Sequence, residues 1–220
     1  VGNAEEAIEC YQLSQVVFEE LGDRLGTATI LSRMARVYGQ EDRTIEAATC
    51  YARAVRILVE AGSINGLSAS LAGLATGLLV LVSSGIPEPV GFRNLADIDS
   101  TEPWNKAALK QARACALESL EINRAIPNPE LDAHVTVVLA RLDAAEGKRG
   151  DATDRFHSLL SQTTIPLYQA QCHYWLWKLE LDPTVDHRGI AEAILGQLPD
   201  RERDREVEWL LERIRLGRLP

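Results

Sequence analysis

The side chains that most often carry catalysis or bind metals are present but are not spaced for either role. The chain has four histidines and four cysteines among 220 residues. A zinc site needs a spacing such as H-E-x-x-H or paired cysteines, and neither occurs. Cys172 and His173 are neighbours on a predicted helix and project about 100° apart, so they cannot converge on one ion. We therefore expect core or surface histidines, and neither a metal site nor a cofactor.

Motifs that bind phosphate or build a nucleophile are also missing from the sequence. It contains no G-x-x-x-x-G-K-[ST], G-x-G-x-x-G or G-x-S-x-G. The acidic pair Asp97 and Asp99 has no basic or metal-binding residues near it in sequence. The sequence therefore predicts a protein that is not an enzyme.

The cysteines, Cys10, Cys50, Cys115 and Cys172, form no C-x-x-C pair, and each lies inside an apolar helical pattern. We expect small buried side chains with reduced thiols, as in the cytoplasm, although a disulfide framework is the alternative.

Charge and hydropathy exclude two classes of partner. The formal net charge is −9 and the isoelectric point about 5.0, so the chain repels phosphate backbones and nucleic acid is not expected to bind. The longest apolar run, residues 67–82, is too short and too rich in small polar residues to span a bilayer, and no signal peptide is visible. We expect no membrane partner and a cytoplasmic location.

Self-similarity at an interval of 40 residues is the main signal in the sequence. Residues 3–38 align with 43–78 without a gap, and both turn and core residues are kept. The apolar spacing predicts a helix over 27–38 and a second over 44–61, ended by Gly62. Each unit is therefore a pair of helices.

These units resemble the tetratricopeptide repeat family. The family pattern has a small residue late in the first helix (helix A), then an alanine, an aromatic residue and an alanine in the second (helix B). The positions that match it are Ala35, Ala47, Tyr51 and Ala54, then Ala7, Tyr11 and Ser14, and later Ala140, Ala152, Phe156 and Leu159. The tryptophan and proline of the 34-residue unit are missing, so the chain looks like the longer variety found in kinesin light chains, cell-polarity adaptors and bacterial regulators.

The resemblance implies an all-α fold, a right-handed superhelical solenoid of antiparallel helix pairs with about 10–11 helices. We expect one array over 1–220. Its parts are a half repeat at 1–22, repeats at 27–62, 66–125 and 130–162, a degenerate repeat at 166–198 and a capping helix at 200–217. The chain starts on a helix B, so we expect either a fragment of a longer protein or other residues packed against this helix.

Residues 83–103 interrupt the third unit with three prolines and two glycines. This stretch is either an ordered but inert excursion or a loop that contacts a partner, with Phe92 and Ile86 as anchors. Further on, Trp175 and Trp177 belong to an aromatic-rich helix. They lie either at an interface or between this helix and a capping helix that bears Trp209.

The groove-facing positions of the family fall on the helices A of this chain. Those that the resemblance predicts to bind a partner are Thr29, Ser32, Arg36, Gln40, Ala69, Ala72, Thr76, Val80, His134, Val137, Arg141 and Ala145. Arg36 and Arg141 would either hold a carboxylate of the partner or pair with acids of this chain.

The resulting hypothesis is a non-catalytic scaffold or sensor segment of a larger, bacterial, cytosolic signalling protein. It would bind another protein or a peptide on the concave helix-A face, and upstream domains of the same protein are further partners. The alternatives are a domain that senses a peptide or small molecule, and a helical accessory region of an enzyme whose catalytic domain lies upstream.

Overall fold

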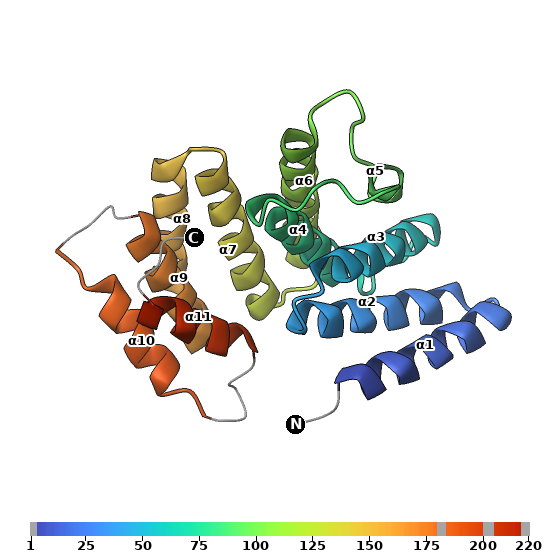
Figure 1. Ribbon diagram of the computed structural model, residues 1–220, viewed down its shortest axis with the longest axis horizontal. Coiled ribbons are helices and arrows are strands. Elements are labelled where there is room, and N and C mark those ends of the chain that lie inside the picture. The colour runs from blue at the N-terminus through green and yellow to red at the C-terminus, as the bar shows by residue number, and fades with distance from the viewer. Residues whose placement is uncertain (1–3, 180–183, 200–204, 217–220) are drawn as a thin grey trace. The chain divides into compact units, whose positions relative to one another are not determined.

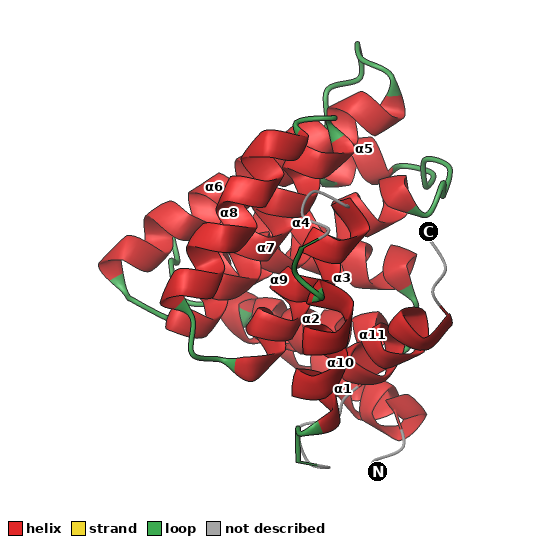
Figure 2. Cartoon of the chain, turned by 90° about the vertical axis from the view of Figure 1, so that its left-hand side faces the viewer, coloured by secondary structure: helices red, strands yellow, loops and turns green. Residues whose placement is uncertain are grey.

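A computed structural model describes residues 4–179, 184–199 and 205–216, and within them every regular element is a helix (Figures 1 and 2). Two compact units, 1–127 and 128–220, divide the chain. The first unit contains α1 (Ala4–Glu20), α2 (Arg24–Gln40), α3 (Thr44–Glu60), α4 (Leu67–Ser83), α5 (Phe92–Leu95) and α6 (Trp104–Ala125). The second contains α7 (Pro129–Ala145), α8 (Arg149–Gln162), α9 (Pro166–Leu179), α10 (His187–Gly196) and α11 (Arg205–Leu216).

Inside each unit the helices pack on their neighbours in chain order. In the first unit α1 packs on α2, α2 on α3, α3 on α4, and α4 on α6. In the second, α7 packs on α8, α8 on α9, α9 on α10, and α10 on α11. This sequential packing is what a helical repeat protein requires, because each pair covers the apolar face of the next. The prediction of an all-helical repeat fold is confirmed.

The interval of 40 residues is visible in the helix bounds of the first unit. α1 and α3 have equal lengths, and their first residues are Ala4 and Thr44. The match is less close for the helices A. Gly26 lies inside α2, whereas its sequence equivalent Gly66 has a left-handed φ of 78° and directly precedes α4. α4 therefore starts three residues later than the interval predicts.

Small residues let α3 and α4 approach closely. A Cβ atom on Gly73 would lie 2.4–2.6 Å from the ring of Tyr51, and one on Gly77 would lie 3.0 Å from the Cβ of Ala48. Across the other side of α4, the buried Ser68 and Ser119 each donate a hydrogen bond of 2.9 Å to the other's carbonyl oxygen. α4 is therefore fixed between α3 and α6 by close packing and a reciprocal serine pair.

The predicted insertion is present between α4 and α6, and it folds onto the first unit. Phe92 is only 2% exposed and meets the ring of Trp104 edge-on, with 6.1 Å between centroids. Arg93 pairs with Glu88 at 2.8 Å and donates a 3.1 Å hydrogen bond to the carbonyl of Glu102. The expectation that Phe92 is available to a partner is wrong for this structure, because its ring is buried in its own chain.

One expectation about the cysteines also needs correction. Cys50, Cys115 and Cys172 are buried, but Cys10 is exposed on α1, and all four are free thiols. Burial raises the pKa of Cys50 to about 11 and the pKa of both Cys115 and Cys172 to about 12, so these three thiols stay protonated at neutral pH. Cys10 lies among apolar residues in the sequence, but α1 buries the side that bears Ile8 and leaves Cys10 exposed.

Candidate functional site

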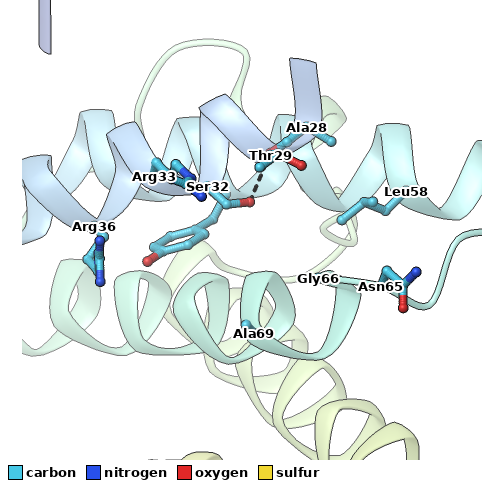
Figure 3. A pocket seen from close by; sticks show the side chains of 10 residues that line it. Ala28, Thr29, Ser32, Arg33, Arg36, Leu58, Asn65, Gly66 and Ala69 are labelled. Atoms are coloured by element: carbon cyan, nitrogen blue, oxygen red, sulfur yellow. Dashed lines mark hydrogen bonds between the residues drawn. The ribbon is translucent and has the colours of Figure 1, made fainter. Parts of the chain in front are cut away.

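A hollow of about 240 Å³ opens between α2, α3 and α4 in the first unit (Figure 3). We call it the helix-A hollow, since most of its wall comes from α2 and the start of α4. The residues that line it are Ala28, Thr29, Ser32, Arg33, Arg36, Tyr51, Leu58, Asn65, Gly66 and Ala69. It brings together four of the residues that the sequence predicted, Thr29, Ser32, Arg36 and Ala69.

Two hydroxyl groups of the hollow are turned back onto their own helix. The Thr29 hydroxyl donates to the carbonyl of Leu25 at 2.9 Å, and the Ser32 hydroxyl lies 3.0 Å from the carbonyl of Ala28. Ser32 also lies 2.8 Å from the hydroxyl of Ser70 on α4. Through this pair, the lining residue Ser32 joins α2 to α4, the next helix A.

Tyr51 reaches the hollow from α3, and the glycine opposite fixes its place. Its ring lies directly over Gly73, where no side chain fits. Burial raises the pKa of the Tyr51 hydroxyl, and the nearby positive charge of Arg36 offsets part of this rise. The phenol is therefore neutral at physiological pH and can donate a hydrogen bond.

The charged groups of the hollow are both arginines. Arg33 and Arg36 are exposed and lie three residues apart on α2, which places them on neighbouring positions of the helix surface. Figure 3 shows both side chains at the α2 wall. No aspartate or glutamate belongs to the lining set. The hollow is thus locally positive in a chain whose net charge is −9.

The remaining predicted groove residues do not join this hollow. Gln40 and Thr76 lie on α2 and α4 but outside its lining. His134 and Arg141 lie on α7 in the second unit. There the guanidinium of Arg141 stacks over the ring of Trp175 at 4.8 Å. Burial, with a smaller effect of Arg141, lowers the pKa of His134 to about 4, so it is neutral at pH 7.

Trp175 and Trp177 pack mainly within the second unit. Both half-buried rings meet Tyr174 edge-on, with centroids 5.2 and 6.0 Å away, and Tyr174 in turn meets Trp209 at 5.9 Å. This arrangement matches the alternative of packing toward the helix that bears Trp209. Lys178 lies 4.6 Å above the ring of Trp177, which covers part of that ring.

Three histidines of the second unit lie closer together than the sequence indicated. Nδ1 of His173 lies 2.7 Å from Nδ1 of His187, and the ring centroid of His157 is 6.3 Å from that of His187. Desolvation and the two neighbouring histidines lower the pKa of His173. Among the described residues, no group of three or more His, Cys, Asp or Glu side chains is arranged to hold a metal ion.

The repeat geometry agrees with a comparison against known families. Residues 1–58 match the family model for the tetratricopeptide repeat. This match supports a relationship of the segment to the tetratricopeptide repeat family. The match covers α1, α2 and most of α3, and so includes the α2 wall of the hollow. No curated protein matches the chain.

Tetratricopeptide repeats generally mediate protein–protein interactions and are typically not catalytic. Within the described parts of the chain, no helix is long and apolar enough to cross a membrane. Sequence reasoning missed Arg33 and Asn65 as lining residues. Arg33 follows Thr29 by four positions, so helical spacing places it on the same side of α2. The family pattern, however, directed attention to the i, i+3, i+7 and i+11 positions alone.

Proposed function

We propose that this protein holds a peptide or a segment of a partner protein on its helix-A face, at the helix-A hollow. The observation that carries the proposal is the hollow itself, which lies on two successive helices A and is lined by Thr29, Ser32 and Arg36. The family pattern predicts partner contacts at these three positions. Gln40 and Thr76 would extend the contact along the same helices, and Arg141 with His134 would provide a second contact surface on α7.

The chemistry of the lining suits recognition. It combines apolar surface from Leu58 and the ring of Tyr51 with the polar groups of Asn65 and two arginines. A few polar groups placed among apolar surface are what orient a ligand and select it. We further propose that the chain belongs to the long-repeat variety and acts as the scaffold or sensor segment of a larger cytosolic regulatory protein of bacteria.

The proposal is tested by filling the hollow without changing its charge. Ala69 is exposed on α4 and lines the hollow, so Ala69→Trp places a large ring inside it. Ala114 is an exposed alanine in the middle of α6 and is outside the lining, so Ala114→Trp is the matched control. Peptides are first selected from a random display library against the full chain.

We expect Ala69→Trp to weaken the selected peptides at least tenfold, because the ring occupies their site, and Ala114→Trp to leave the affinity unchanged. Thermal unfolding of both variants checks that each remains folded. The proposal is wrong if the two tryptophan variants bind the peptides as tightly as the unmodified chain, or if both lose binding equally.

A further inference from the structure

The two arginines of the helix-A hollow differ from most other arginines of the first unit. Within the described residues, neither Arg33 nor Arg36 forms an ion pair. The surrounding arginines do: Arg43 pairs with Glu46 at 2.9 Å, and Arg53 with Glu19 at 3.4 Å. The acids in the described parts of the chain therefore form no ion pair with the two arginines of the hollow.

This pattern favours the partner-binding role of Arg36 over pairing with an acid of its own chain. In a chain with 32 acidic and 23 basic residues, an exposed arginine readily finds an acid of its own chain. Arg141, the other candidate, stacks on Trp175 at 4.8 Å instead of facing an open hollow. Arg36 lines the same hollow as Tyr51, and its positive charge lowers the pKa of the Tyr51 hydroxyl. Arg33 lies one helical turn away on α2. Two guanidinium groups thus border one cavity that has no carboxylate in its wall.

We propose that the partner of this hollow is an acidic peptide segment, whose aspartate or glutamate side chains are bound by Arg33 and Arg36. This inference rests on the proposed function and names the chemistry of its partner. A guanidinium fork donates two parallel hydrogen bonds to a carboxylate, and such charge-assisted bonds are stronger than neutral ones. Tyr51 and Asn65 add neutral donors, while Leu58 and Ala69 offer apolar surface to a neighbouring side chain of the segment.

The acidic groups are side chains of an internal segment and not a terminal carboxylate. Two arginines on one helix can each bind a separate carboxylate, which two neighbouring acidic side chains supply, whereas a terminal carboxylate by itself supplies one. The net charge of −9 also affects which acidic peptides bind. Outside the hollow it repels an acidic ligand, so binding depends on the local arginines and is weakened by salt.

The test uses the tightest peptide from the display library, resynthesised with an amidated C-terminus, and a second version with every Asp and Glu replaced by Asn or Gln. Fluorescence polarisation measures both against the full chain. We expect the neutral version to bind at least tenfold more weakly. Arg33→Gln and Arg36→Gln are each expected to weaken the acidic peptide roughly tenfold.

Arg124→Gln is the control, because it removes the same charge from an exposed site on α6.

A tightest peptide without acidic residues, or equal binding of the acidic and neutral versions, overturns the inference. If Ala69→Trp still abolishes binding in that case, the proposed function stands. If an acidic peptide binds but neither Ala69→Trp nor the two glutamine variants weaken it, both proposals fail. Binding that is lost on amidation of the C-terminus shows recognition of a chain end and also overturns the inference.

Discussion

Gly73 on α4 is predicted to be indispensable for placing Tyr51 in the wall of the helix-A hollow. A Cβ atom at this position would lie 2.4 Å from the tyrosine ring, about 1 Å closer than ordinary carbon contact allows. Forcing an extra methyl group into a packed contact costs about 1–3 kcal/mol. The gain in helix propensity from glycine to alanine returns about 1 kcal/mol at most. Because the contact of 2.4 Å is far inside van der Waals distance, the upper part of the packing cost applies, about 2–3 kcal/mol. After the gain in helix propensity, we expect Gly73→Ala to lower the free energy of unfolding by about 1–2 kcal/mol.

Urea unfolding followed by circular dichroism measures this effect. Gly39→Ala is the matched control, because Gly39 also lies in a helix and has nothing within 4 Å of an added Cβ. It should be neutral or slightly stabilising. In the Gly73→Ala background, Tyr51→Leu should cost less than it does in the unmodified chain, since the shorter side chain relieves the clash. An unchanged or raised midpoint for Gly73→Ala refutes the packing of Tyr51 on α4 described above.

Three further predictions concern other parts of the chain. Under native conditions, a thiol reagent should modify Cys10 alone, and after unfolding all four cysteines should react, as counted by mass spectrometry. Acidification should lower the free energy of unfolding from about pH 6.5 downward, because the pKa of His173 is lowered in the folded chain and the unfolded chain therefore takes up this proton first. Replacing His173, which contacts His187, by Gln should reduce this dependence of the unfolding free energy on pH, measured by urea titrations at several pH values. Arg155→Ala removes the 2.6 Å ion pair that covers the buried carboxylate of Asp143, and it should cost about 1–2 kcal/mol in the same assay, less than for a fully buried pair because Arg155 is partly exposed.

The helices could be predicted from the sequence because their signals are local. Apolar spacing and Gly62 placed the end of α3 within one residue of where it lies, at Glu60. Pro127 likewise lies between the end of α6 at Ala125 and the start of α7 at Pro129, because proline interrupts a helix. These features depend on backbone preferences within one or two turns, which a single sequence records directly.

Side-chain partners could not be predicted because they depend on contacts between distant segments. Nothing local shows that Arg141 stacks on Trp175, or that His173 reaches His187 on the following helix. Phe92 illustrates the opposite error, in which an aromatic residue in a proline-rich loop suggested exposure and tertiary packing buried it. Family positions identified Arg36, but Arg33 emerged only from the geometry of the hollow.

Hydrogen–deuterium exchange, with and without the selected peptide, tests the central claim most directly. If the partner lies on successive helices A, amides of α2 and α4 near the helix-A hollow should exchange more slowly in the complex, and those of α6 should not change. Protection confined to the second unit, or spread over α6 with none in α2, would contradict the account.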